Sequence, residues 1–93
     1  MKVTYLPHAL RRMDERGIAR WEAKAVLEAP DVEYPGHVFE RVVAERVLPG
    51  RRLAVKVVYN LGAEDERIVV TVELGRPTPH RRRGPAEQEG GER

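Results

Sequence analysis

Residues 8–18 read HALRRMDERGI, and the spacing of their apolar side chains predicts a helix. The apolar residues of this region share one arc of a helix that advances 100° per residue: Leu6, Ala9, Leu10 and Met13. Pro7 suits the first helical position, where its missing N–H costs nothing, and Gly17 supplies a left-handed stop. The sequence therefore predicts a helix over residues 6–17, with Thr4 just upstream as its cap.

Three basic residues follow one another at a spacing of four: His8 and Arg12 lie opposite the apolar arc, and Arg16 lies at its edge. Like charges at this spacing disfavour a bare helix, and a bound phosphate would compensate them. In that hypothesis the two guanidinium groups bind the phosphate and His8 carries a proton. Asp14 and Glu15 offer the alternative, because acids within reach of the arginines would make this an ordinary solvated helix face.

Residues 19–29, ARWEAKAVLEA, predict a second helix that Pro30 ends. Its apolar stripe consists of Ala23, Val26 and Leu27. Trp21 lies outside that stripe, so we expect it to pack on a neighbouring strand or on a partner chain.

From Asp31 onward the pattern favours strands. Residues 31–36 predict a short edge segment that ends in a Pro-Gly turn. Residues 38–48 also fit a helix by their apolar spacing, but their valine content and the Pro-Gly turn that follows favour a strand with a bulge.

Two further stretches alternate as strands do, and the loop between them predicts a hairpin. In residues 51–60 the inward side chains are expected to be Leu53, Val55, Val57 and Tyr59. In residues 67–74 they are expected to be Ile68, Val70, Val72 and Leu74.

The predicted fold class is α+β, with one domain over residues 1–74. Two N-terminal helices pack on one face of a three- to four-stranded antiparallel sheet, and the other face is exposed. Residues 75–93 contain no large apolar side chain and are rich in glycine and proline, so we expect a disordered basic tail.

The charge of the chain constrains its partners. Up to residue 74 there are 12 Lys+Arg and 12 Asp+Glu, whereas the last 19 residues hold 5 Arg and 3 Glu. The folded part is therefore not basic overall, and any site for a polyanion must be a local patch. Charged residues make up 34% of the chain, with arginine in excess over lysine, which resembles the composition of heat-adapted proteins.

The chain contains no cysteine and no apolar run near the roughly 20 residues that cross a membrane. These features predict a cytoplasmic protein that does not enter a membrane. His8, His37 and His80 lack the spacing of metal ligands, so we expect neither a metal nor another cofactor.

The motif HA-x-x-RM-x-x-RGI over residues 8–18 resembles the signature of a small bacterial family described only as a domain of unknown function. Three further stretches resemble the same family: AVLEAPDVEYPG (25–36), GRRLAVKVVY (50–59) and RIVVTVEL (67–74). The resemblance implies a fold related to the RelE/ParE/BrnT-like toxins, and hence toxin–antitoxin systems and RNA cleavage for some relatives. This chain departs from the family at Ala19, where relatives often have Ser or Thr, and at residues 73–74, where they often have Tyr.

In a toxin-like fold, an RNA backbone would lie on a cationic face of the sheet. The candidate RNA-binding residues are Arg52 and Lys56 on one strand and Arg41 and Arg46 on the adjacent segment. Nearby acids offer the alternative that ion pairs neutralise this face: Glu40, Glu45 and Glu73.

The candidate catalytic residues are His8, Arg12, Arg16 and Tyr59. Without a metal, the 2′-hydroxyl would attack the adjacent phosphate, a cation would stabilise the phosphorane, and His8 or Tyr59 would move protons. Tyr59 also lies on the apolar side of its strand, which favours a place in the core.

Two functions follow as hypotheses. The first is an RNA-binding protein or metal-independent ribonuclease of the toxin–antitoxin type, whose partner is RNA or an antitoxin-like protein. The second is a non-enzymatic interaction module, either a homodimer or an inactive toxin relative, for which Trp21 and the edge segment 31–35 are the motivation. The basic run 80–83 (HRRR) could bind nucleic acid or an acidic partner.

Overall fold

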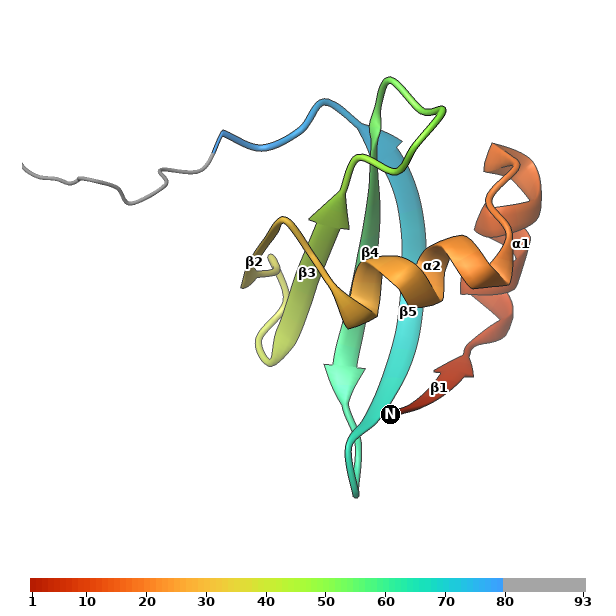
Figure 1. Ribbon diagram of the computed structural model, residues 1–93. Helices are drawn as coiled ribbons and strands as arrows, with labels where there is room; N and C mark the ends of the chain where they lie inside the picture. The colour runs from red at the N-terminus through yellow and green to blue at the C-terminus, as the bar shows by residue number, and fades with distance from the viewer. Residues whose placement is uncertain (80–93) are drawn as a thin grey trace, which may run out of the picture.

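Two helices and one mixed sheet make up residues 1–79, the part of the chain that the computed structural model describes (Figure 1). The elements in chain order are β1 (Lys2–Tyr5), α1 (Pro7–Arg16), α2 (Arg20–Glu28), β2 (Val32–Pro35), β3 (Arg41–Arg46), β4 (Ala54–Leu61) and β5 (Glu66–Gly75). The five strands lie in the order β1-β5-β4-β3-β2. Among these strands, β1 runs parallel to β5, and every other neighbouring pair is antiparallel. The α+β class is confirmed, whereas the expected three- to four-stranded antiparallel sheet is wrong in strand number and in direction at this edge.

The missing element in the prediction is β1. Thr4, expected to cap the first helix, lies in this strand instead, and its Oγ1 donates a hydrogen bond to Glu66 Oε2 at 2.5 Å. Helix α1 begins at Pro7 without a side-chain cap at Leu6. Strand β1 has only four residues, and its partner β5 follows some 60 residues later. The spacing of apolar residues in so short a segment does not predict a strand.

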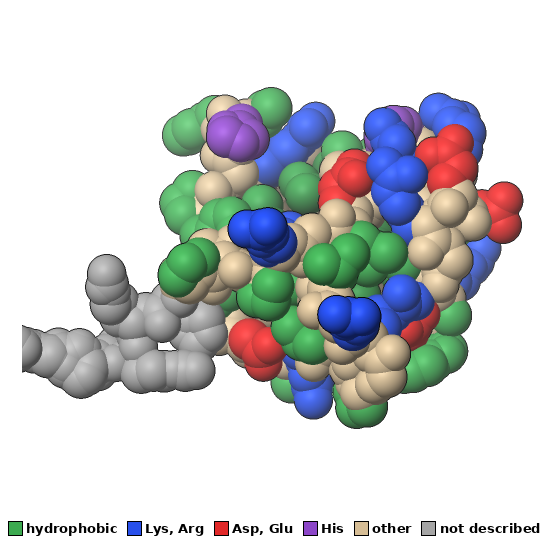
Figure 2. Space-filling view, turned by 90° about the horizontal axis from the view of Figure 1, so that it is seen from above, with side chains coloured by type: hydrophobic (Ala, Val, Ile, Leu, Met, Phe, Trp, Pro, Cys, Tyr) green, Lys and Arg blue, Asp and Glu red, His purple; other side chains and the backbone are tan. Residues whose placement is uncertain are grey.

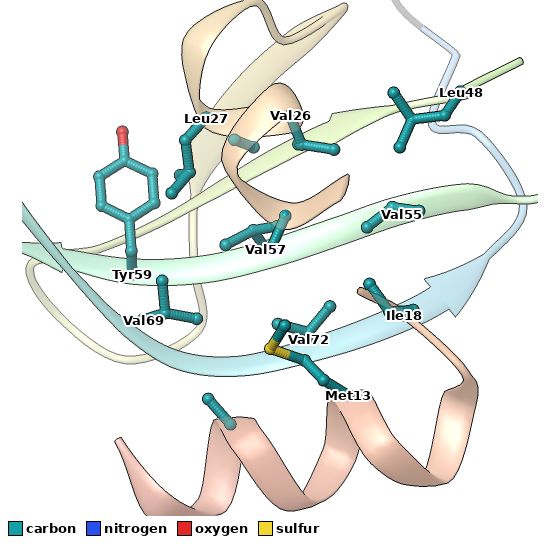
Figure 3. Close-up of a cluster of buried hydrophobic side chains, with 13 residues drawn as sticks. Met13, Ile18, Val26, Leu27, Leu48, Val55, Val57, Tyr59, Val69 and Val72 are labelled. Atoms are coloured by element: carbon teal, nitrogen blue, oxygen red, sulfur yellow. The ribbon is translucent and has the colours of Figure 1, made fainter. Parts of the chain in front are cut away.

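The core lies between the two helices and one face of the sheet. Helix α1 packs along β5, and α2 packs across β4 and β3. Figure 3 shows side chains from both helices meeting those of β4 and β5 in this cluster. The fully or almost fully buried members include Met13, Ile18, Val26, Leu27, Leu48, Val55, Val57, Tyr59, Val69 and Val72.

A bulge changes which residues of β5 face the core. The register shifts between Val58 and Tyr59, so that Val57 lies opposite Val72 but Tyr59 lies opposite Val69. The extra residue in β5 reverses the alternation, because side chains in a strand alternate faces with a period of two. Val69 is therefore buried and Val70 only half-buried, which corrects the expected inward set in this strand.

The expected inward set of β4 holds except at its start. Val55, Val57 and Tyr59 are buried, but Leu53 precedes β4 and is 43% exposed. Within the ambiguous stretch 38–48, residues Arg41–Arg46 form strand β3 rather than a helix, as the valine content favoured. The expected bulge is wrong, because β3 pairs with β2 and β4 in an unbroken register.

The boundary of the predicted tail also needs correction. Gly75 is the last residue of β5, and the segment that follows it to Pro79 is fixed on the sheet by hydrogen bonds of Thr78. The remaining residues, 80–93, including the basic run at 80–83, lie outside the described part of the chain. Within residues 1–79, neither helix has the length and apolar character needed to span a membrane.

Candidate nucleic-acid interface

Helix α1 divides the signature motif into a buried half and an exposed half. Ala9, Met13 and Ile18 are buried in the core cluster. Gly17 adopts φ of 66°, the left-handed conformation that glycine accepts without strain, and it ends the helix there. The apolar residues of the motif therefore form the core, and its glycine ends the helix. Neither role accounts for the basic residues Arg12 and Arg16.

Arg12 and Arg16 converge on one carboxylate, that of Glu73 in β5. The distance from Arg12 Nε to Glu73 Oε2 is 3.9 Å, and that from Arg16 Nη2 to Glu73 Oε1 is 3.5 Å. Arg12 also lies 3.5 Å from Glu15 Oε1. Each of these side chains is more than one-third exposed: Arg12 at 35%, Arg16 at 37% and Glu73 at 38%. Long, partly exposed pairs of this kind are weak, so another anion can replace the carboxylate at little cost.

The position of α1 explains how its arginines reach Glu73. Helix α1 lies alongside β5, beyond the point where the short β1 ends (Figure 1). Val72 is buried beneath the helices, so Glu73 points to the opposite side of the sheet, which we call the open face. The arginines thus lie at the edge of the open face, one helical turn apart.

Glu73 belongs to a row of charged residues across the open face. It lies opposite Lys56 in β4, which in turn lies opposite Glu45 in β3. The ammonium of Lys56 is 3.6 Å from Glu45 Oε2. Negative and positive side chains therefore alternate along the row from α1 toward β2.

Glu45 is the most enclosed charged side chain in this row, with only 2% of its surface exposed. Its Oε1 accepts the backbone N–H of Thr78 at 2.7 Å, and its Oε2 accepts the Thr78 hydroxyl at 2.7 Å and the Tyr34 hydroxyl. Burial raises the pKa of Glu45, but the hydrogen bonds from Thr78 and Tyr34, with the charge of Lys56, lower it overall. Sequence reasoning treated Glu45 only as a neutralising acid and missed Tyr34 and Thr78, because nothing local links three segments so far apart.

Tyr59 lies on the other side of the sheet from Glu73. It is 4% exposed among core side chains, and its hydroxyl donates a hydrogen bond to Glu33 Oε2 at 2.7 Å. Burial, followed by the hydrogen bond to Glu33, raises the pKa of Tyr59 to about 12. The structure therefore does not bring Tyr59 to Arg12 and Arg16, and its core position agrees with its side of the strand.

His8 lies one helical turn before Arg12 and is not part of the Arg12–Arg16–Glu73 group. It lies in the first turn of α1, with its Nδ1 3.4 Å from Arg11 Nη2. Eight residues of helix place Arg16 about 12 Å farther along the axis. The four candidate catalytic residues therefore do not form one constellation.

The four candidate RNA-binding residues are divided between three places. Arg41 and Lys56 lie on the open face, as their register with Asn60 and Glu45 shows. Arg46 lies on the helix side, opposite the buried Val55, and its Nη1 donates to the Ala29 carbonyl at 3.4 Å.

Arg52, the fourth of these residues, is exposed in the loop before β4. Figure 2 shows Lys and Arg side chains interspersed with acidic and hydrophobic ones on the end of the molecule that it views. The expected single cationic sheet face is absent from residues 1–79, because Arg46 and Arg52 lie off the open face and Glu45 and Glu73 flank Lys56 on it.

Arg51 has a structural role that the sequence did not indicate. Its Nε and Nη2 donate to the two carboxylate oxygens of Glu22 at 2.7 and 2.8 Å, and Nη2 also donates to the Gly17 carbonyl at 2.8 Å. Glu22 in turn accepts the N–H of Ala19 at 2.9 Å, which compensates for the missing Ser or Thr cap. This contact fixes the loop between β3 and β4 to the junction of the helices.

Comparison with known families supports membership of a family described as a domain of unknown function. Residues 5–73 match the model of a family described as "Domain of unknown function (DUF4258)". The chain belongs to this family. The matched DUF4258 region contains both helices together with Arg12, Arg16 and Glu73. No curated protein and no solved structure matches the chain.

No group of three or more His, Cys, Asp or Glu side chains within residues 1–79 is arranged to hold a metal ion. The Arg12–Arg16–Glu73 group, in which each side chain is more than one-third exposed, is the candidate site for an anion.

Proposed function

We propose that this DUF4258 domain binds the phosphate backbone of RNA at the α1 edge of the open face. The observation that carries the proposal is the convergence of Arg12 and Arg16 on the Glu73 carboxylate. Two guanidinium groups aimed at one anionic position form a site that also suits a phosphate, since guanidinium binds both anions through paired N–H donors.

Replacement of Glu73 by a phosphate is energetically reasonable. The contacts are 3.5 Å or longer and exposed, so the existing ion pairs contribute about 0–1 kcal/mol each. A backbone phosphate presents two charged oxygens to the arginines, as the carboxylate does, and its binding also releases counterions from the RNA.

The arrangement supports binding without cleavage. Tyr59 lies across the sheet with a pKa of about 12, and His8 is at the far end of α1. Tyr59 is therefore on the opposite side of the sheet from a phosphate held by the two arginines, and His8 lies one helical turn before Arg12, on the side away from Arg16. The resemblance to RelE/ParE/BrnT-like toxins favours RNA over other polyanions as the ligand. The same resemblance makes an antitoxin-like protein a further partner of this chain in the proposal.

A salt titration of RNA affinity tests the proposal. Fluorescence anisotropy with a labelled single-stranded RNA compares the wild type with R12A/R16A and with R20A/K24A. The second double variant is the matched control, because it removes two exposed basic side chains from α2. We expect R12A/R16A to flatten the slope of log affinity against log salt by about 0.7, the value for the loss of one phosphate contact with a single strand.

The control should retain the wild-type slope. Equal losses in the two double variants, or the absence of salt-dependent RNA binding by the wild type, would contradict the proposal.

A second candidate function, self-association, is favoured by one observation. Phe39 in the loop between β2 and β3 is 89% exposed, beside the edge strand β2. Trp21, which lies outside the stripe of α2, is 66% exposed rather than packed on a strand. A homodimer through the β2 edge would cover Phe39. Sedimentation of the wild type and Phe39→Ser at micromolar concentration tests this candidate: a dimer that the substitution dissociates supports it, and a monomer at all concentrations excludes it.

A further inference from the structure

The segment that follows β5, residues 76–79, forms a strap across one end of the open face. It leaves the end of β5 and runs toward the β2 side of the sheet (Figure 1). Thr78 is its point of attachment, with hydrogen bonds to Glu45 in β3 and to Tyr34 in β2. Pro77 and Pro79 flank Thr78 and restrict the segment to extended conformations.

The contact with Glu45 has a specific donor pattern. One residue supplies a donor to each carboxylate oxygen, the Thr78 N–H to Oε1 and the Thr78 hydroxyl to Oε2, both at 2.7 Å. The Tyr34 hydroxyl and the Lys56 ammonium, at 3.6 Å, hold the carboxylate from its remaining sides. Glu45 is thus a pre-oriented acceptor for a ligand that carries two neighbouring hydrogen-bond donors.

We infer that Glu45 and Tyr34 form a guanine-binding site, which Thr78 occupies until RNA displaces it. The inference rests on the proposed RNA-binding function. Among the RNA bases, guanine presents two adjacent donors, N1–H and the N2 amino group, on the edge that proteins read in single strands. A carboxylate that accepts both donors discriminates guanine from adenine, whose N1 is an acceptor.

The position of the site suits this assignment. Glu45, Lys56 and Glu73 occupy one row across three adjacent strands. Strands in a sheet lie about 4.8 Å apart, so Glu45 is about 10 Å from the anion position at Arg12 and Arg16. A few nucleotides of single-stranded RNA span that distance, with a phosphate at one end of the row and a base at the other.

A peptide from another protein fits the same carboxylate less well. It would offer the donors that Thr78 already supplies, and Thr78 is tethered to the site at high effective concentration. Guanine in RNA adds the phosphate contact with the arginines, so RNA has an advantage that a competing peptide lacks.

Nucleoside titrations followed by NMR test the inference on the full chain. Guanosine and adenosine carry no phosphate, so their binding does not depend on Arg12 and Arg16. The chain has only three threonines, and the Thr78 signals report directly on the site. We expect guanosine, and not adenosine, to shift the Thr78 signals while those of Thr4 and Thr71 stay in place.

Three variants sharpen the test. Thr78→Val removes the hydroxyl donor and should tighten guanosine binding roughly tenfold. Glu45→Gln replaces one acceptor with a donor and should abolish it. Glu33→Gln is the matched control, because Glu33 also accepts a tyrosine hydroxyl but on the helix side of the sheet, and it should bind guanosine as the wild type does.

Equal shifts with both nucleosides, or no guanosine-dependent shift of the Glu45 backbone amide even in Thr78→Val, would overturn the inference. Tighter binding of a GRPTP peptide than of guanosine to Thr78→Val would assign the site to protein segments and also overturn it. RNA binding that depends on the arginines but shows no guanine preference would remove the inference and leave the proposed function. If guanosine bound but RNA showed no salt-dependent binding, the assignment of Glu45 as a guanine site would stand and the proposed RNA-binding function would be contradicted.

Discussion

Replacement of Arg51 by Met should destabilise the fold far more than its exposure suggests. Arg51 joins Glu22 through two hydrogen bonds and the Gly17 carbonyl through a third. Glu22 is only 8% exposed, so the substitution leaves a nearly buried carboxylate with the Ala19 N–H as its remaining partner. Methionine preserves most of the length of the side chain and removes the charge and the donors.

The expected loss follows from these contacts. Two hydrogen bonds between charged groups contribute about 1.5 kcal/mol each, so the free energy of unfolding should fall by about 3 kcal/mol. That is a large share of the roughly 5–15 kcal/mol that holds a small domain folded.

The effect should also depend on pH. The hydrogen bond from Arg51 is the main cause that lowers the pKa of Glu22 in the folded chain. A carboxylate with a lowered folded-state pKa contributes stability above its unfolded pKa of about 4.3 and loses it as the pH falls through the folded value. The difference between wild type and Arg51→Met should therefore shrink below about pH 4.3.

Urea denaturation followed by far-UV circular dichroism at pH 7 and pH 3 measures both effects. Arg52→Met is the matched control, because Arg52 is the adjacent arginine, exposed in the same loop. We expect the control to change stability by less than about 0.5 kcal/mol. If Arg51→Met matched the control, or lost equal stability at both pH values, the reasoning about Glu22 would be refuted.

Three further substitutions test the fold. Val57→Ala leaves a cavity at a fully buried position between the sheet and the helices, and should lower the free energy of unfolding by about 2–4 kcal/mol in urea denaturation. Gly17→Ala forces a side chain into φ of 66° and should cost about 1 kcal/mol in the same assay; an unchanged midpoint would refute the left-handed cap. Tyr59→Phe should remove the phenol that ionises near pH 12 from an ultraviolet titration and leave RNA affinity unchanged. Because the folded-state pKa of Tyr59 is raised, its contribution to stability should be full below pH 10 and lost as the pH rises through 12.

Local patterns were sufficient for the helices and for the central strands. The apolar arc of α1, the stop at Gly17 and the alternation through Val55, Val57 and Tyr59 all follow from the spacing of side chains along one element. Strand β1 and the bulge in β5 depend instead on partners far away in the chain, and no local spacing encodes them. Plain alternation over residues 67–74 predicts Val70 inward, whereas the bulge turns Val69 inward instead.

The candidate site was predicted less completely. Arg12 and Arg16 stood out because their spacing places them on one side of a helix, and the structure brings them together at Glu73. Glu45 could not be distinguished from a surface acid, because its burial depends on Thr78, 33 residues later. The alternation of its strand did place Tyr59 on the apolar side, but the contact of its hydroxyl with Glu33 links residues 26 apart and has no local signal.

Glu73→Gln is the most direct test of Arg12 and Arg16 as phosphate ligands. The substitution removes the carboxylate that occupies the anion position and leaves both guanidinium groups in place. Affinity for single-stranded RNA should rise by about two- to fivefold, as expected for the loss of a competing surface ion pair. Glu28→Gln, at an exposed position at the end of α2, makes the same change in net charge and should have a smaller effect. Unchanged or weaker RNA binding by Glu73→Gln would contradict the assignment of this position to phosphate.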